Sequence, residues 1–427
     1  MGIEKSKYKI HIVGAGVSGL IAATVLEQNG YHPIIIESTD RAGGRVKTDV
    51  SNQIPFDYGF QVLLTDYPMV KKYLDLEELQ LAYFDPGASI ITDKKKMTIG
   101  DPLRKFSFAI PTLLSKIGSF GDKIKIVSLQ KRLKSKTVEE IFDSEETTTM
   151  EYLKSHGFSE EMIKLFFQPF FSGIFLENEL STSSRMFEFI YKMFGEGYAA
   201  IPKDGIGAIP NQLKVKLKNT EFIFNTEVAK VADGHISLKN GETMESDLTI
   251  IATDANALVS NLRGQEISWK GCDTLYFEVE KQDSKFKVIE LFANKEAIIN
   301  SVFSLNDLFE WNNPNHILSV TVVKKHELTT DDLIKKVTQE LNMYLGLTKV
   351  KFLKHYPIKI ALPDIGNVQN IISPEETRLT SRVFLAGDTL LNGSLNGAMQ
   401  SGELAAMGVI NLLEESQDLA QFTSEYI

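Results

Sequence analysis

The stretch Tyr8-Lys9-Ile10-His11-Ile12-Val13-Gly14-Ala15-Gly16-Val17-Ser18-Gly19 decides how the rest of the chain is interpreted. Its apolar first half predicts a strand that runs into a glycine turn. Apolar residues at helical spacing follow from Leu20 to Leu26, and Asn29-Gly30 marks the end of that helix. A second apolar run, Pro33–Ile36, ends at Glu37. The predicted order is therefore strand, glycine turn, helix, strand and acid.

This is the order that a dinucleotide-binding site needs. Gly14 allows the tight turn, Gly16 allows the backbone to approach a pyrophosphate, and Gly19 allows the helix to pack closely on the strand. The helix N-terminus offers free N–H groups and partial positive charge to the phosphates. The predicted phosphate-binding residues are Gly14, Ala15, Gly16, Ser18 and Gly19.

Glu37 falls about 20 residues beyond the glycines, where a carboxylate accepts a hydrogen bond from a ribose hydroxyl. A carboxylate at this position would repel a 2′-phosphate, so NADP is disfavoured. The glycine motif alone does not separate NAD from FAD.

The segment Arg41-Ala42-Gly43-Gly44-Arg45 comes directly after the acid. An acid followed by R-x-G-G-R resembles the flavin amine oxidase, protoporphyrinogen oxidase and phytoene desaturase superfamily. The resemblance implies that Gly43 and Gly44 let the backbone reach the pyrophosphate of FAD and that Arg45 helps to hold it, with Arg41 beside them. The alternative for both arginines is a solvated turn.

The C-terminal part carries Val383-Phe384-Leu385-Ala386-Gly387-Asp388 and then Gly393-Ser394-Leu395-Asn396-Gly397-Ala398. This strand, Gly-Asp loop and helix of small residues resemble the second FAD signature of the superfamily. The resemblance implies that Gly387 and Asp388 contact the ribitol or pyrophosphate. It also implies that the N–H groups of Asn396, Gly397 and Ala398 face the pyrimidine edge of the flavin, where a helix N-terminus stabilises negative charge. The alternative is a terminal amphipathic helix after a core strand.

Three further contacts are implied by the resemblance. Phe56–Val62 contains a glycine turn that the superfamily places against the flavin ring, which makes Gly59 and Gln61 candidates. A β-turn without a ligand is the alternative. Val228 ends a predicted strand, 222–228, and matches a residue whose backbone holds the adenine edge. An ordinary core valine would look the same in the sequence.

The apolar patterns and the resemblance predict an α/β protein of two domains. The first is a discontinuous, Rossmann-like FAD-binding domain made of residues 1–75, 215–262 and 352–427. The second is an inserted α+β substrate domain, made of a helical, Phe-rich part (76–214) and a mostly antiparallel sheet (263–351). Strands expected in that sheet are 273–280, 288–293 and 316–323.

Composition limits the class of protein. The 427 residues are 43% hydrophobic and 24% charged, which is ordinary for a soluble globular protein. A net charge of -10 argues against nucleic acid as a partner. The single cysteine, Cys272, excludes an internal disulfide or cysteine metal cluster, and fits a cytoplasmic protein. No metal site is predicted, and the oligomeric state is left open.

Residues 102–136 are basic, whereas the chain as a whole is acidic. The segment contains nine lysines and arginines but one acid, Asp122, and large apolar residues lie between them in the sequence. The favoured interpretation is a pair of amphipathic helices packed on the substrate domain with a solvated basic face. The alternative is peripheral contact with an anionic membrane.

Phenylalanine and methionine are concentrated in Leu165–Phe175 and Ser183–Phe194. Such density is usually core. In phytoene-desaturase-like and protoporphyrinogen-oxidase-like proteins the corresponding part roofs an apolar substrate cavity, so both interpretations stay open.

The implied reaction is hydride transfer from a C–H bond of an apolar or amine-containing substrate to the flavin, with reoxidation by oxygen or another acceptor. The flavin is expected to be non-covalent, because no cysteine lies in the C-terminal motif. No catalytic residue is assigned, since the seven histidines are scattered without ligand spacing. Three alternatives remain: a non-redox flavin isomerase of the UDP-galactopyranose mutase kind, an NAD-dependent dehydrogenase, and a non-catalytic flavin-binding protein.

Overall fold

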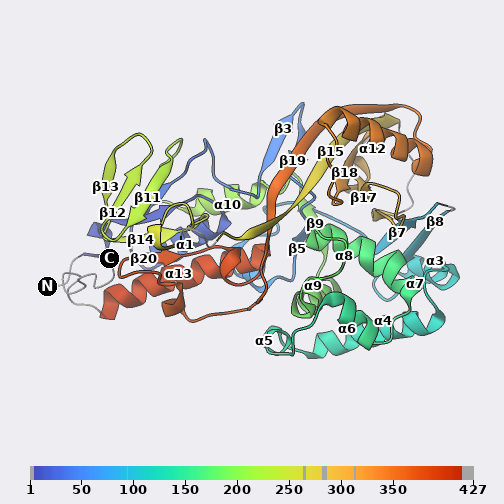
Figure 1. Cartoon of the computed structure of the whole chain (residues 1–427), viewed down its shortest axis with the longest axis horizontal. Coiled ribbons are helices and arrows are strands. Elements are labelled where there is room, and N and C mark those ends of the chain that lie inside the picture. The colour runs from blue at the N-terminus through green and yellow to red at the C-terminus, as the bar shows by residue number, and fades with distance from the viewer. Residues whose placement is uncertain (1–3, 94, 263–265, 281–285, 312–313, 416–427) are drawn as a thin grey trace.

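A five-stranded parallel sheet forms the centre of the first domain (Figure 1). The computed structural model describes residues 4–93, 95–262, 266–280, 286–311 and 314–415. The strand order is β10-β2-β1-β14-β20, with every neighbouring pair parallel. The strands are β1 (Ile10–Val13), β2 (Ile34–Ile36), β10 (Glu221–Ile223), β14 (Leu248–Ile251) and β20 (Val383–Leu385). Because they come from the beginning, middle and end of the chain, this domain is discontinuous.

Both faces of this sheet are covered, which explains why its strands are apolar throughout. Ile12 belongs to the core beneath the helices, whereas its neighbour Val13 belongs to the core beneath a small antiparallel meander. This division follows from the alternation of side chains along a strand. The helices are α1 (Val17–Gln28), α10 (Ala208–Lys216) and α13 (Leu395–Glu415), and the meander strands are β11 (Val228–Ala232), β12 (His235–Leu238) and β13 (Thr243–Glu245).

A seven-stranded sheet forms the second domain, in the order β19-β15-β18-β17-β16-β7-β8. Its pairs are antiparallel except for β7 with β16, which confirms the predicted mostly antiparallel sheet. Helix α12 (Thr330–Leu345) packs Leu333, Val337 and Leu341 on it. The strands are β7 (Gly87–Ile91), β8 (Lys96–Gly100), β15 (Ser268–Glu280), β16 (Ile289–Phe292), β17 (Ile299–Ser304), β18 (Asn315–Val322) and β19 (Val350–Asp364).

The remaining elements form a helical region and two small strand pairings. The helices are α2 (Pro68–Tyr73), α3 (Ala109–Leu114), α4 (Phe120–Ser135), α5 (Val138–Phe142), α6 (Thr149–Ser155), α7 (Glu160–Met162), a π-helical turn (Ile163–Phe167), α8 (Gln168–Phe175), α9 (Ser184–Glu196) and α11 (Leu305–Phe309). The strands are β3 (Thr48–Ser51) with β4 (Ile54–Asp57), and β5 (Leu63–Leu64) and β6 (Leu81–Tyr83) with β9 (Ala199–Pro202). None of the described helices is long and apolar enough to cross a membrane.

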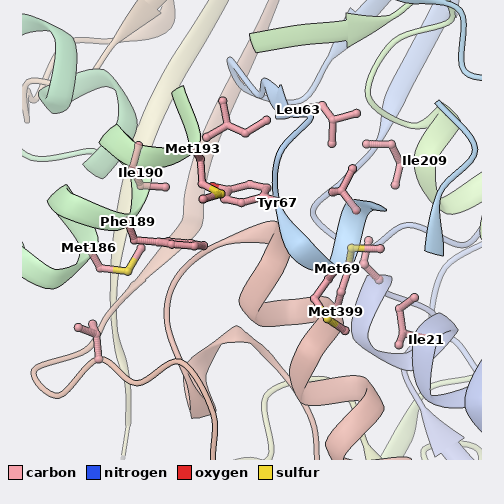
Figure 2. Packing of buried hydrophobic residues seen from close by; sticks show 14 of the residues in the cluster. Ile21, Leu63, Tyr67, Met69, Met186, Phe189, Ile190, Met193, Ile209 and Met399 are labelled. Carbon is pink, nitrogen blue, oxygen red and sulfur yellow. The ribbon is translucent and has the colours of Figure 1, made fainter. Parts of the chain in front are cut away.

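One hydrophobic core joins the two domains. Figure 2 shows Met186, Phe189, Ile190 and Met193 of α9 on one side and Ile21, Ile209 and Met399 of α1, α10 and α13 on the other. Leu63, Tyr67 and Met69, from β5 and the start of α2, lie between them. The helical region is therefore packed against the first domain.

Two details differ from the expected elements. The predicted strand 222–228 is broken at Asn225, whose φ of 53° is left-handed, so Val228 begins a different sheet. The predicted domain boundary at 352 falls inside β19, which pairs with β15 from Val350 to Asp364. The chain therefore leaves the seven-stranded sheet only after Asp364; the other domain boundaries stay predictions.

Candidate functional site

The first glycine turn lies at the carboxyl end of β1. The Gly14 N–H donates to the Ile36 carbonyl (2.8 Å), and its φ of 105° favours glycine. A methyl group added at Gly19 would lie 2.1 Å from the Gly14 oxygen, so helix α1 approaches the turn too closely for any side chain. A methyl group added at Gly16 would meet nothing within 4 Å. The turn is thus open only where Gly16 faces outward, at the N-terminus of α1.

The second glycine loop lies directly on the first. The Gly43 N–H donates to the Ala15 carbonyl (2.9 Å), and Gly16 and Gly43 form a parallel bridge. Gly43 and Gly44 have φ values of 132° and 59°. A methyl group at Gly44 would lie 3.2 Å from the Gly16 Cα. The two predicted pyrophosphate loops therefore form one continuous surface of backbone.

Glu37 ties the end of β2 to these loops. The side chain is buried, and Oε2 accepts from the Ala15 N–H at 2.8 Å. Oε1 accepts from the N–H and the hydroxyl of Thr39 (2.8 Å each) and from the Ser38 hydroxyl (3.2 Å). Within the described residues Oε1 accepts three hydrogen bonds and Oε2 accepts one, so Oε2 is the oxygen that can accept a further bond, such as one from a ribose hydroxyl.

An ion pair joins the two signature motifs, which are 343 positions apart in the chain. Arg45 donates from Nη1 to Asp388 Oδ2 (2.9 Å) and from Nη2 to Asp388 Oδ1 (2.5 Å). Nη1 also donates to the Ala361 carbonyl (3.1 Å), and the guanidinium lies 5.1 Å from the Trp269 ring centre. Asp388 is buried. The paired donors match the carboxylate geometry, which makes this contact stronger and more directional than a lysine would allow.

The N-terminus of α13 completes this region. Ser394 caps the helix: its hydroxyl accepts from the Gly397 N–H and its carbonyl accepts from the Ala398 N–H, each at 2.9 Å. The N–H groups of Leu395 and Asn396 have no partner among the described residues. Of the three N–H groups expected to face the flavin, two are thus used within the helix, and Leu395 supplies a free one that the sequence did not indicate.

The other predicted contact residues lie at different distances from these loops. Gln61 Nε2 donates to the carbonyls of Tyr58 (2.7 Å) and Arg45 (3.0 Å), so it lies against the second loop. Gly59 has a φ of 99° and faces the Ile358 side chain of β19. Arg41 instead pairs with Asp49 (2.8 Å), and no described hydrogen bond joins it to the glycine loops.

Val228 and the remaining predicted residues pack around the nucleotide loops. Val228 is buried in β11, two residues after Thr226, whose N–H donates to the Glu37 carbonyl (2.9 Å). Ser18 is buried where α1 meets α13, because a methyl group at Gly402 would lie 2.2 Å from the Ser18 oxygen. The Gly387 N–H donates to the Ser401 hydroxyl (2.9 Å).

The profile of the flavin containing amine oxidoreductase family matches residues 17–410. The chain belongs to this family. It is 28% identical over 168 residues to protoporphyrinogen oxidase 2, chloroplastic/mitochondrial, of Arabidopsis thaliana, covering 39% of this chain and 32% of that protein. It is 30% identical over 157 residues to an L-amino-acid oxidase of Sistrurus catenatus edwardsii, covering 35% and 30%. The chain thus spans about a third of the length of these curated relatives.

The fold of the family is also found among solved structures. The structure of an oxidoreductase from Methanosarcina mazei superposes with a TM-score of 0.70 at 17% identity, covering 94% of this chain and all of that one. The predicted α/β fold, with a Rossmann-like parallel sheet and a mostly antiparallel second sheet, is confirmed. The proteins of this family bind flavin in the form of FAD.

An aromatic cluster lies between the Gly59 turn and the seven-stranded sheet. The rings of Tyr58 and Tyr356 have centres 4.1 Å apart, and those of Phe56 and Tyr276 4.9 Å. Phe60 contacts Phe303, with ring centres 5.1 Å apart. Phe56, Tyr276, Phe303 and Tyr356 are buried, and only Tyr58 and Phe60 are partly exposed next to the turn that the family resemblance places against the flavin ring.

Asp49 anchors the polar edge of this cluster. Its carboxylate accepts from Arg41 (2.8 Å), Lys354 (2.8 Å), Tyr356 (2.9 Å) and Tyr58 (3.1 Å). Burial opposes ionisation, but these four hydrogen bonds outweigh it and hold the pKa of Asp49 well below its usual range. The network connects the β3–β4 hairpin to β19, and therefore the nucleotide domain to the substrate domain.

Asp57 is a buried acid that was not predicted from the sequence. Its Oδ1 accepts from the Thr48 hydroxyl (2.5 Å) and from the Ile206 N–H (2.9 Å). Burial raises the pKa of Asp57 to about 6, although both hydrogen bonds act in the opposite direction. The signal in the sequence is weak: an aspartate that ends the apolar run of β4.

The Phe-rich segment is mainly core. Phe167, Phe171 and Phe187 are completely buried and contact one another. Phe166, Phe170 and Phe194 are partly buried beside them. These positions stabilise the helical region, and the apolar roof of a substrate cavity stays a prediction for the partly buried rings.

Two further expectations concern thiols and metals. Cys272 lies in β15, outside the C-terminal motif, and burial raises the pKa of its thiol to about 12. The thiol is therefore protonated and poorly nucleophilic near neutral pH. Within the described ranges, no three His, Cys, Asp or Glu side chains are grouped so that they could hold a metal ion.

Proposed function

We propose that the chain is an FAD-dependent oxidoreductase that binds FAD non-covalently and removes a hydride from a C–H bond of an apolar or amine-containing substrate. The bidentate Arg45–Asp388 pair is the observation that carries the proposal, because it brings the N-terminal and C-terminal signatures into one site. The family match supports the choice of FAD over NAD. Bound FAD supplies the hydride acceptor that no amino-acid side chain provides.

The residues present fit this cofactor. The open side of Gly16 accommodates a pyrophosphate against backbone N–H groups at the start of α1. Glu37 Oε2 can accept a further hydrogen bond, such as one from a ribose hydroxyl. The free N–H groups of Leu395 and Asn396, at the N-terminus of α13, would stabilise negative charge on the ring. Each feature is available without rearranging the backbone.

The chain would position the substrate and exclude water. The partly exposed rings of Tyr58 and Phe60, next to the Gly59 turn, would contact alkyl groups by burial or cations through their quadrupole. These two rings are the support for an apolar or amine-containing substrate. We assign no proton-transferring residue, and a cytoplasmic location stays a prediction.

The absorbance spectrum of the purified protein, repeated on the supernatant after heat denaturation, tests the cofactor. Flavin bands that move into the supernatant, with the mass of FAD, are expected. Flavin that stays with the pellet would contradict non-covalent binding. A colourless protein that also fails to take up added FAD would contradict the central proposal and favour the dehydrogenase alternative.

Anaerobic stopped-flow mixing with amines, tetrapyrroles and polyenes tests the reaction. Bleaching of the flavin absorbance by one of these classes is the expected result. Bound FAD that no class bleaches would favour a non-redox isomerase or a non-catalytic flavin-binding protein.

A further inference from the structure

Residues 103–127 leave an unusual number of large apolar side chains in solvent. Seventeen such side chains are exposed in the described chain, and eight of them lie in this short segment. Helix α3 has no buried residue, and its side chains Ile110, Leu113 and Leu114 are exposed. The eight are Leu103, Phe106, Ile110, Leu113, Leu114, Phe120, Ile124 and Val127. An exposed patch of this kind marks an interaction site.

Helix α4 organises part of this patch into a stripe. Phe120, Ile124 and Val127 are spaced by four and three residues and therefore lie on one helix face. Lys131 and Lys134 continue the same face toward the C-terminus of the helix. The buried residues Leu129 and Leu133 hold the helix on the protein. The outward face is thus apolar along its first half and basic along its second.

The charge of the patch has one sign. Asp122 is the single acid between residues 102 and 136, and it is buried, accepting hydrogen bonds from Ser119 and Ser159. Lys116, Lys131 and Lys134 are exposed and form no ion pair with any described residue. Since the whole chain carries a net charge of -10, this basic surface is a local feature that an anionic partner would recognise.

The patch is mounted rigidly rather than on a loose loop. Arg104 donates to the carbonyls of Phe194 and Gly197 (2.6 Å each) at the end of α9, and its guanidinium lies 4.4 Å from the Tyr198 ring centre. Phe108 is completely buried. Figure 1 shows α3 and α4 at the edge of the molecule opposite the marked termini. The patch can therefore meet an extended surface without obstruction by the nucleotide domain.

We propose that residues 103–134 form a docking surface for an anionic lipid bilayer. Leu103, Phe106 and the residues of α3 would enter the boundary between headgroups and acyl chains, while Lys131 and Lys134 would face the anionic headgroups. Burial of apolar side chains and attraction by lysines act together in such peripheral binding. The proposal concerns a surface far from the glycine loops in sequence and does not depend on the flavin chemistry.

Co-sedimentation of the holoprotein with vesicles tests the proposal. The protein is expected to bind mixed phosphatidylcholine–phosphatidylglycerol vesicles, to bind pure phosphatidylcholine more weakly, and to lose binding as salt is raised. The double variant Phe106→Ser/Leu114→Ser, and separately Lys131→Glu/Lys134→Glu, should lower the partition coefficient by about tenfold or more. All four side chains are exposed, so the variants should fold normally.

Matched controls change exposed residues elsewhere. Met343→Ser/Ile371→Ser removes two exposed apolar side chains, and Lys325→Glu/Lys335→Glu reverses two exposed charges; both should bind like the unmodified protein. Unmodified protein that stays in the supernatant with anionic vesicles would overturn the proposal. So would self-association in sedimentation velocity that Phe106→Ser/Leu114→Ser abolishes, since the patch would then join two copies of the chain. Flavin absorbance is measured in every sample, so that failure to bind vesicles can be distinguished from failure to bind FAD.

Discussion

Two glycines of the same turn should fail in different ways when each is replaced by alanine. The Gly16→Ala methyl group would enter the open space where the pyrophosphate is proposed to bind, since no protein atom lies within 4 Å of it. The backbone at Gly16 has a φ of −68° and a ψ of 175°, which alanine adopts without strain. This substitution should therefore affect cofactor binding far more than it affects the fold.

The expected magnitudes follow from these contacts. Alanine is a poorer N-cap than glycine, but it also lowers the entropy of the unfolded chain, so the apo-protein should change in stability by less than about 1 kcal/mol. Loss of close approach to the pyrophosphate should raise the Kd for FAD by about 30-fold or more, which is about 2 kcal/mol. Gly19→Ala differs, because its methyl group would lie 2.1 Å from the Gly14 oxygen. Overpacking of this kind costs about 1–3 kcal/mol in the apo-protein itself.

Thermal unfolding of the apo-proteins, followed by FAD titration, separates the two effects. Gly16→Ala should unfold close to the unmodified protein and lose most of the stabilisation by FAD, which is about 2.7 kcal/mol when FAD is present at about 100 times its Kd. Gly19→Ala should unfold at a lower temperature with or without FAD. Gly121→Ala, in the exposed first turn of α4, is the matched control; it should leave the Kd for FAD unchanged and change the stability by less than about 1 kcal/mol. An unchanged Kd in Gly16→Ala would refute the placement of the pyrophosphate at this turn.

Three further predictions concern buried charges. Arg45→Met should destabilise the apo-protein by about 3 kcal/mol, because Asp388 would be left buried without its partner, and should weaken FAD binding; urea unfolding and FAD titration measure both. Glu37→Gln should cost about 1–3 kcal/mol in urea unfolding, because an amide cannot accept all four hydrogen bonds that the carboxylate receives. Asp57→Asn should stabilise the protein at pH 7 but not at pH 4. The pKa of Asp57 in the folded protein, about 6, exceeds the ordinary value of 3.8. The unmodified protein therefore loses stability as the pH rises from about 4 to about 6, by up to about 3 kcal/mol, whereas the asparagine side chain of the variant does not titrate.

Each of these predictions has a clear contrary result. Stability of Arg45→Met equal to that of the unmodified protein would mean that Asp388 finds another partner. Comparison with Arg45→Lys, which keeps the charge but lacks the paired donors, would separate the effect of charge from that of geometry. Glu37→Gln with unchanged stability would show that the hydrogen bonds to the carboxylate contribute little to the folded state. A stability difference between Asp57→Asn and the unmodified protein that does not vary between pH 4 and pH 7 would mean that Asp57 has an ordinary pKa in the folded state.

The architecture could be predicted because its signals are local. The sequence from β1 to Glu37 contains a strand, a turn that needs glycine and an apolar helix in immediate succession, and each was recognised from residue type and spacing. The pairing of β1 with β14 and of β14 with β20 joins distant segments. That long-range order came from the resemblance to the superfamily, since no local pattern specifies which parallel strands are neighbours.

The interactions of the site were harder to predict than its location. The arginine of the glycine loop and the aspartate of the C-terminal motif were each assigned to FAD, but nothing in the sequence shows that Arg45 and Asp388 bind each other. The capping of α13 by Ser394 likewise removes two N–H groups that spacing alone leaves free. The solvent exposure of side chains could not be predicted from the sequence either. The apolar residues of α3 were interpreted as the inner face of a helix pair, and only the tertiary structure shows that they are exposed to solvent.

The Arg45–Asp388 pair also bears on how FAD would enter. Arg45 has five N–H donors, and the described contacts use two on Nη1 and one on Nη2, which leaves Nε and the second Nη2 hydrogen for an anion. The loops are already held together by Glu37 and by the Gly43–Ala15 hydrogen bond. A pyrophosphate would therefore add contacts to a site that is formed without it, and little conformational entropy would oppose binding. The affinity for FAD should accordingly depend on the geometry of Arg45 rather than on its charge alone, so that Arg45→Lys behaves more like Arg45→Met than like the unmodified protein.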